Sequence, residues 1–181
     1  YTLCFHQVYE ELPDGTRTHD LFKHLKEGEC FVTDIYEKWS VPTCSSLYKK
    51  EIMNKRPVDS RFIVGDLINF LTCAMYGRMY CMKDVMGVYR RLDTGWVRMN
   101  TNTYSFAKKR IAYHQALEEH FLAFKQLIHP SIVESYVYAT LKSLKSKPID
   151  FIPLFCKGIS SFGFDYMKEM VRMLCEKNNK A

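Results

Sequence analysis

The stretch GDLINFLTCAMYGRMYCMKDVMGVYRR, residues 65–91, contains the clearest succession of two structural elements in this chain. From Leu67 onward the apolar residues recur every three or four positions, which predicts an amphipathic helix. Gly77 suits the left-handed conformation that commonly ends a helix, because glycine has no Cβ to clash. Residues 79–90 then predict a strand, or a bulged pair of short strands. A helix followed by a strand of this kind indicates an α+β fold.

The residues before this stretch predict a series of short elements. The sequence Pro13, Asp14, Gly15 predicts a turn, because proline presets φ and glycine accepts a positive φ. In chain order we expect a strand over residues 1–9, a short helix capped by Thr18 and closed by Gly28, a second helix over residues 33–39, a strand over residues 43–48 and a loop over residues 49–61.

After residue 100 the pattern predicts helices only. Apolar residues follow one stripe over residues 104–128, which predicts a long helix that Pro130 ends. Ser131 and Glu134 have the spacing of a capping box for the next helix. Further helices are expected over residues 148–155 and 164–175. The predicted organisation is thus a domain of short strands and helices over residues 1–100, followed by an all-helical extension over residues 101–181.

The composition is that of a chain that packs a core. Of its 181 residues 47% are apolar and 14% aromatic, more than a disordered chain carries. The seven cysteines are an odd number without a Cys-x-x-Cys pair, which argues against a disulfide framework or a zinc ribbon and favours a reducing, cytoplasmic location. His114 lies on the apolar stripe and is predicted to be a hydrogen-bonded core histidine.

Positive charge gathers towards the C-terminus. The formal net charge is +6, and residues 131–181 carry eight basic side chains against five acidic ones. Such a segment favours anionic surfaces; a solvated basic face without a partner is the alternative. The basic residues are Lys142, Lys145, Lys147, Lys157, Lys168, Arg172, Lys177 and Lys180.

The order of residues 65–91 resembles the acceptor-side core of family 2 glycosyltransferases of the GT-A type. That family has an Asp at the start of a helix, a Gly at its end, a short strand and a Tyr-Arg-x-His motif. Four residues fit the pattern, namely Asp66, Gly77, Tyr89 and Arg90. Two residues depart from it, since Leu67 replaces a usual Trp and Leu92 replaces the usual His.

The resemblance extends to the first hundred residues. YTLCFHQV at the start looks like the family's mid-domain strand, and VPTCSSLYKK, residues 41–50, looks like its acceptor-side stretch. The family's nucleotide-binding half, with its Asp-x-Asp metal motif, would lie before Tyr1, and the chain has no Asp-x-Asp. The resemblance therefore implies a fragment of a longer enzyme, partial in its GT-A-like domain.

The resemblance also implies site residues. Asp66 would be the general base that deprotonates the acceptor hydroxyl, so that transfer inverts the anomeric centre. Tyr89 and Arg90 would contact the donor diphosphate, with a divalent cation, Mn or Mg, held by ligands outside this chain. A plain helix cap is the alternative for Asp66, and a salt bridge to Asp84 or Asp93 is the alternative for Arg90.

Hydroxyl and aromatic side chains complete the predicted acceptor site. Thr43, Ser45 and Ser46 resemble residues that bond sugar hydroxyls in the family, although such residues also simply terminate strands. Trp96 has a broad apolar face on which a sugar ring can stack.

The leading hypothesis is a fragment of an inverting glycosyltransferase that moves a sugar from a nucleotide-sugar to a glycan or lipid-linked acceptor. It would act in the cytoplasm, with possible peripheral contact at the inner membrane face through the basic C-terminal helices. The alternative is a non-catalytic helical module that binds partners or anionic surfaces. Nucleic-acid binding is not expected, because the aromatic residues follow core periodicity and not the exposed pattern of a stacking platform.

Overall fold

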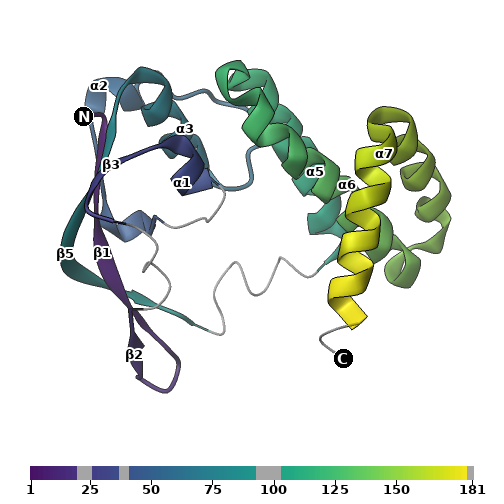
Figure 1. Cartoon of the computed structure of the whole chain (residues 1–181), viewed down its shortest axis with the longest axis horizontal. Helices are drawn as coiled ribbons and strands as arrows, with labels where there is room; N and C mark the ends of the chain where they lie inside the picture. The colour runs from purple at the N-terminus through teal and green to yellow at the C-terminus, as the bar shows by residue number, and fades with distance from the viewer. Residues whose placement is uncertain (20–25, 37–40, 93–102, 179–181) are drawn as a thin grey trace. The chain divides into compact units, whose positions relative to one another are not determined.

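The structure, a computed structural model, describes residues 1–19, 26–36, 41–92 and 103–178. The chain divides into two compact units, Tyr1–Trp96 and Val97–Ala181, and Figure 1 shows a sheet with helices in the first and helices in the second. The α+β fold class is therefore confirmed.

A mixed sheet forms the frame of the first unit. Its order is β2-β1-β5-β3, with β4 also paired to β1. The strands are β1 (Leu3–Glu11), β2 (Arg17–Thr18), β3 (Gly28–Cys30), β4 (Ser46–Tyr48) and β5 (Met79–Arg90). The two long strands, β1 and β5, run parallel. Such a pair needs a crossover connection, and α3 (Gly65–Tyr76) lies within it.

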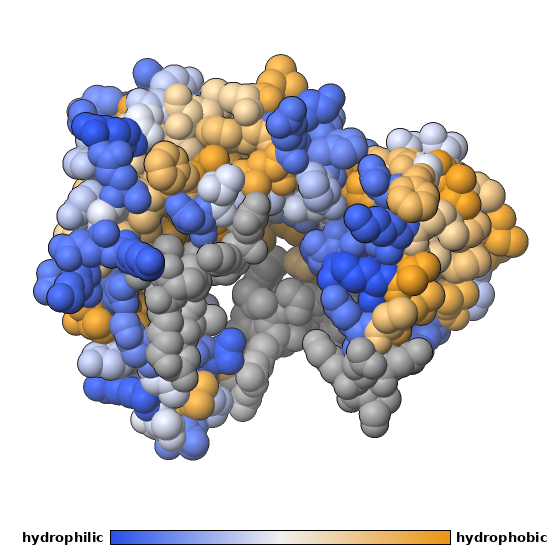
Figure 2. Space-filling model, in the orientation of Figure 1, coloured by the Kyte–Doolittle hydropathy of each residue, from blue (hydrophilic) through white to orange (hydrophobic). Residues whose placement is uncertain are grey.

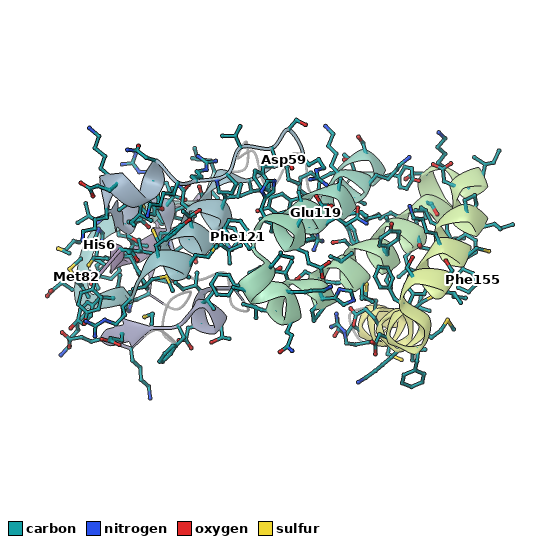
Figure 3. The ribbon with its side chains drawn as sticks, turned by 90° about the horizontal axis from the view of Figure 1, so that it is seen from above. His6, Asp59, Met82, Glu119, Phe121 and Phe155 are labelled. Atoms are coloured by element: carbon teal, nitrogen blue, oxygen red, sulfur yellow. The ribbon has the colours of Figure 1, made fainter. Side chains whose placement is uncertain are left out.

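The pairing of β1 with β5 is bulged. His6 lies opposite Met82, but the register shifts on both sides of Gln7, so that Val8 lies opposite Gly87. Figure 3 shows His6 and Met82 next to each other at this point of the sheet. Of the two predicted alternatives for residues 79–90, a single strand is confirmed, and its pairing with β1 contains the bulge. Extra residues in one strand increase its local twist.

The core of the first unit lies between the sheet and α3. Phe70 and Cys73 of the helix pack in one cluster with Leu3, Phe5 and Val8 of β1. Burial of one such large apolar side chain stabilises a fold by about 1.5–3 kcal/mol. The apolar spacing that predicted this helix is thus the spacing of its buried face. The described part of this unit also contains two short helices, α1 (Val32–Tyr36) and α2 (Lys50–Met53).

Several local predictions in this unit are wrong. Thr18 ends strand β2 and Gly28 begins strand β3, so neither bounds a helix, and residues 20–25 lie outside the described residues. Residues 43–45 form a 3-10 turn, η1 (Thr43–Ser45), and only Ser46–Tyr48 is a strand. The expected loop over residues 49–61 contains α2.

Gly77 ends α3 as predicted but for a different reason. Its φ is 172°, which is extended backbone and not the left-handed conformation. A Cβ at this position would lie 2.6 Å from Cγ2 of Thr2. Thr2 is fixed there because its amide donates to the Arg78 carbonyl at 2.8 Å and its hydroxyl donates to the Cys73 carbonyl at 2.9 Å. The glycine therefore admits the start of β1.

Helices alone form the described part of the second unit. They are α5 (Tyr104–His120), η2 (Leu122–Phe124), α6 (Lys125–Ser146), η3 (Pro148–Asp150) and α7 (Phe151–Asn178). The Thr103 hydroxyl caps α5 by accepting from the Phe106 amide at 3.1 Å. Ile111, Tyr136, Val137 and Tyr166 lie in one buried cluster of α5, α6 and α7. Gly163, at φ 52°, kinks α7 and separates the two helices predicted there.

The break between the first two long helices is earlier than predicted. Pro130 lies inside α6, and Ser131 and Glu134 are interior residues of that helix and not a capping box. The chain instead turns at Phe121, whose side chain is only 1% exposed. A proline at the sixth residue of a helix removes one intrahelical hydrogen bond, and α6 continues through it. The turn lies instead at Phe121, where the aromatic ring is buried.

His114 is a buried core histidine, as predicted. Its Nδ1 lies 2.7 Å from Ser135 Oγ, and that hydroxyl donates to the Ser131 carbonyl at 2.7 Å. The single hydroxyl proton is thereby used, so Nδ1–H donates to Ser135. Burial, with the nearby Arg110 charge, lowers the pKa of His114 to about 3.

We expect this histidine to make folding sensitive to acid. Below pH 6.5 His114 binds a proton in the unfolded chain, whereas in the folded chain it binds one only at about pH 3. The free energy of unfolding therefore decreases as the pH falls through this window, by up to ~1.4 kcal/mol per pH unit. Urea unfolding at pH 7, 5.5 and 4.5 measures the effect. His114→Gln should lose less stability over the same range; an identical slope would contradict the assignment.

Candidate functional site

The structure brings together two predicted site residues that are 23 positions apart in the sequence. Thr43 begins the 3-10 turn η1, and Asp66 is the second residue of α3. The Thr43 hydroxyl donates a hydrogen bond to Oδ2 of Asp66. A carboxylate fixed in this way through one oxygen keeps its other oxygen, Oδ1, for a further donor.

Asp66 does not cap its helix. The residue at the N-cap position is Val64, and it makes no side-chain capping bond. Asp66 therefore does not hold the N-cap position that the alternative interpretation gave it. Its carboxylate still lies in the first turn of α3, where the positive end of the helix dipole stabilises a negative charge. Asp66 is thus a half-buried carboxylate oriented by a hydrogen bond, a geometry compatible with a general base.

The two serines of the predicted acceptor stretch have local partners. The Ser45 side chain is buried, and its hydroxyl donates to the Pro42 carbonyl at 2.7 Å. The Ser46 hydroxyl donates to the same carbonyl at 3.3 Å. Both hydroxyls therefore stabilise the turn that presents Thr43, and neither is engaged with Asp66.

Two further polar residues lie beside Asp66, and the sequence analysis missed both. Asn69 follows Asp66 by three residues, which places them on one face of α3. Burial raises the pKa of Tyr48, while hydrogen bonding with the side chains of Ser46 and Asn69 lowers it and the Asp66 carboxylate adds to the rise. The Tyr48 ring also stacks on Phe70 at 6.4 Å. The i, i+3 spacing from Asp66 was the signal that could have identified Asn69.

The polar atoms of these two residues are unusual. The Tyr48 hydroxyl and Asn69 Oδ1 are buried, and neither has a well-aligned hydrogen-bond partner within the described parts of the chain. The two side chains are close enough for hydrogen bonding with Asn69 to lower the pKa of Tyr48, although the geometry is not that of a well-aligned bond. A buried unsatisfied polar group costs about 1–3 kcal/mol, and folded proteins hold few of them. The pair lies close enough to Asp66 for its carboxylate to act on the Tyr48 hydroxyl.

Tyr89 and Arg90 are the last two residues of β5. Arg90 Nε is 3.2 Å from Glu11 Oε1, and the arginine side chain is 73% exposed. Arg17 binds the same carboxylate at 2.8 Å, and its hydrogen bond is the main cause that lowers the pKa of Glu11. The alternative of a salt bridge at Arg90 is therefore correct in kind, but the partner is Glu11 and not Asp84. No hydrogen bond or ion pair joins Arg90 to Asp66 among the described residues.

The remaining predicted positions add less. Tyr89 is 40% exposed and Leu92 is 61% exposed at the end of the strand. Trp96, predicted to stack on a sugar, lies outside the described residues, as does Asp93. Within the described ranges no three His, Cys, Asp or Glu side chains gather closely enough to bind a metal ion. Nor does any described helix combine the length and apolarity needed to cross a bilayer.

The chemistry available to Asp66 and its neighbours does not depend on a protein-family assignment. A half-buried carboxylate oriented by Thr43 can accept a proton from a hydroxyl that binds beside it. Searches for similar proteins returned no matching family model, curated protein or solved structure.

Proposed function

We propose that this chain is the acceptor-side part of an inverting glycosyltransferase that uses a nucleotide-sugar, with Asp66 as the general base. The observation that carries the proposal is the hydrogen bond from Thr43 to Asp66. The family resemblance predicted both residues in the acceptor site from separate segments, and their pairing supports it. Fold class by itself carries no function, so the proposal depends on this site.

The proposed step uses the two oxygens of Asp66 differently. Thr43 holds Oδ2, and Oδ1 takes the proton of the acceptor hydroxyl. The deprotonated oxygen attacks the anomeric carbon of the donor sugar from the face opposite the nucleoside diphosphate. The new glycosidic C–O bond forms as the bond to the diphosphate breaks, and the anomeric configuration inverts. General base catalysis of this kind contributes about 10²–10⁴-fold.

Tyr48 and Asn69 are proposed to position the acceptor. Their polar atoms are buried in the free chain, and on acceptor binding they would become exposed and bond to sugar hydroxyls next to the one that reacts. Arg90, at the exposed end of β5, would leave Glu11 for the donor diphosphate, since its planar guanidinium suits two phosphate oxygens. A divalent cation, Mn or Mg, would be held by residues outside this chain.

A non-catalytic interaction module is the second candidate. Large apolar side chains exposed on the helical unit favour it, among them Ile149 and Phe164, which are 79% and 80% exposed. The two candidates differ in what they require of Asp66, because an interaction module built on the helices does not need a carboxylate in the sheet unit.

We expect the 181 residues alone to show no saturable binding of a nucleoside diphosphate with Mn²⁺. The donor diphosphate needs a cation held by hard oxygen ligands, and the residues proposed to supply them lie outside this chain. Isothermal titration calorimetry with uridine and guanosine diphosphates measures this. Micromolar affinity would mean that the donor site is in this chain, which the proposal does not allow.

The test of the proposed function is transfer by the complete gene product. The protein is incubated with a panel of nucleotide-sugars and with monosaccharide, oligosaccharide and lipid-linked acceptors, and the released nucleoside diphosphate is measured. NMR of the product gives the anomeric configuration. Release that depends on the acceptor, with inversion, supports the proposal. No release above the acceptor-free background across the panel, or a product of retained configuration, would overturn it.

A further inference from the structure

The corner between α6 and α7 exposes apolar and basic side chains together. Leu144 is 50%, Ile149 79% and Ile152 69% exposed, and Lys145 and Lys147 between them are exposed as well. We call these five residues the α6–α7 corner. Figure 2 shows apolar colour gathered over the region that α7 occupies in Figure 1, with hydrophilic residues beside it.

The corner has little negative charge to balance its lysines. Between residues 135 and 164 the only acidic residue is Asp150. Its carboxylate accepts a hydrogen bond from the Tyr104 hydroxyl at 2.6 Å, and this bond is the main cause that lowers the pKa of Asp150. Lys147 approaches the same carboxylate only to 3.9 Å. The acid is thus engaged by α5, and the outer side of the corner is basic.

The second half of α7 gives a contrast within the same unit. Phe164, Val171 and Leu174 are 80%, 57% and 44% exposed there, so apolar exposure is similar. Its arginine is paired, however, because Arg172 binds Glu169 at 2.5 Å and Glu176 at 2.6 Å. That surface is balanced in charge and has no attraction for an anionic partner.

The composition of the corner fits a lipid surface better than a protein partner. Protein interfaces are enriched in aromatic residues and Arg and depleted in Lys, whereas this corner combines aliphatic residues with Lys. At a bilayer surface, aliphatic side chains enter the boundary between headgroups and acyl chains to about 5–10 Å. Lysine stems lie along apolar surface while their ammonium groups stay among the headgroups.

We propose that the α6–α7 corner binds the surface of a bilayer that contains anionic lipid. Ile149 and Ile152 enter the interface, and Lys145 and Lys147 contact the headgroups. Each lysine near such a surface strengthens binding about fivefold. At physiological salt the attraction decays with a screening length of about 8 Å. The proposal does not depend on the transferase activity, because it uses only residues of the helical unit.

Co-sedimentation of the full chain with vesicles tests this proposal. Vesicles of phosphatidylcholine alone are compared with vesicles that hold 30% phosphatidylglycerol, each at low and high salt. We expect binding to the anionic vesicles at low salt that weakens at least tenfold at high salt. Lys145→Glu with Lys147→Glu should weaken it at least tenfold. Ile149→Ser with Ile152→Ser should weaken it several-fold, although the charge is unchanged.

The matched control is Val171→Ser with Leu174→Ser, which removes the same number of exposed apolar side chains from the charge-balanced half of α7 and should leave binding unchanged. Circular dichroism checks that each variant is folded. Absence of binding to anionic vesicles at low salt would overturn the proposal. An equal loss in the control variant would overturn it too. So would tight binding of heparin or an oligonucleotide with vesicle binding indifferent to the isoleucine variant, because that result describes a general polyanion surface.

Discussion

Replacement of Asp66 by Asn is expected to lower sugar transfer by the complete gene product at least ~100-fold, the loss that follows when a general base is removed. Asparagine has the same size and can still accept the hydrogen bond from Thr43. It cannot take a proton at neutral pH. Donor affinity should stay within about twofold, because Asp66 is proposed to contact the acceptor and not the diphosphate.

Two variants separate the base from the residues around it. Thr43→Val removes the bond that orients the Asp66 carboxylate and should lower kcat by about tenfold, whereas Thr43→Ser keeps the hydroxyl and should recover most of the rate. Asn69→Leu should raise KM for the acceptor more than it changes kcat. Rates are measured as nucleoside diphosphate released at saturating donor.

The result that would contradict this assignment is near-normal transfer by Asp66→Asn. It would mean that Asp66 has only a structural role and that another group takes the proton. A loss of rate that is accompanied by unfolding of this variant at the assay temperature would give the same conclusion, because a folding defect then accounts for the lower rate. Thermal unfolding of each variant is therefore measured beside the kinetics.

The largest expected effect on folding is at Gly158 in α7. A Cβ placed there would lie 2.3 Å from Cε2 of Tyr166. That ring is fully buried, and its hydroxyl donates to Thr140 Oγ1 at 2.7 Å. Phe155, labelled in Figure 3, contacts it edge-on at 6.1 Å between ring centroids. The ring therefore has no room to move aside without loss of its hydrogen bond.

We expect Gly158→Ala to lower the free energy of unfolding by about 2 kcal/mol. Overpacking of a core costs about 1–3 kcal/mol or more, and the better helix propensity of alanine returns at most about 1 kcal/mol. Urea unfolding followed by circular dichroism measures the change. Ser161→Ala, at an exposed position of the same helix, is the control and should change stability by less than ~0.5 kcal/mol.

A second substitution tests the cause of that loss. Tyr166→Leu alone should destabilise the unit, because it leaves a cavity and removes the bond to Thr140. Combined with Gly158→Ala it should cost less than the sum of the two, since the smaller side chain leaves space for the new methyl group. Strict additivity, or a Gly158→Ala protein as stable as wild type, would contradict the close contact.

Local sequence patterns anticipated much of the fold but little of the site's detail. The spacing of Leu67, Ile68 and Leu71 predicted α3 because one helix face must be buried, and those residues are buried. The methionines of the same stretch differ from one another in burial. Met79 is 2% exposed, but Met75 and Met86 are 41% and 56% exposed. Residue type alone does not say which face of an element finds a partner.

The sequence by itself determined the α+β class, the helix and strand of residues 65–90 and the buried position of His114, because these depend on periodicity within one segment. Only the tertiary structure decided which hydroxyl meets Asp66, since Thr43 reaches it through a turn built on Pro42. It also decided that Thr2 requires a glycine at position 77. Such contacts join residues far apart in the chain, and no local pattern of charge or apolarity records them.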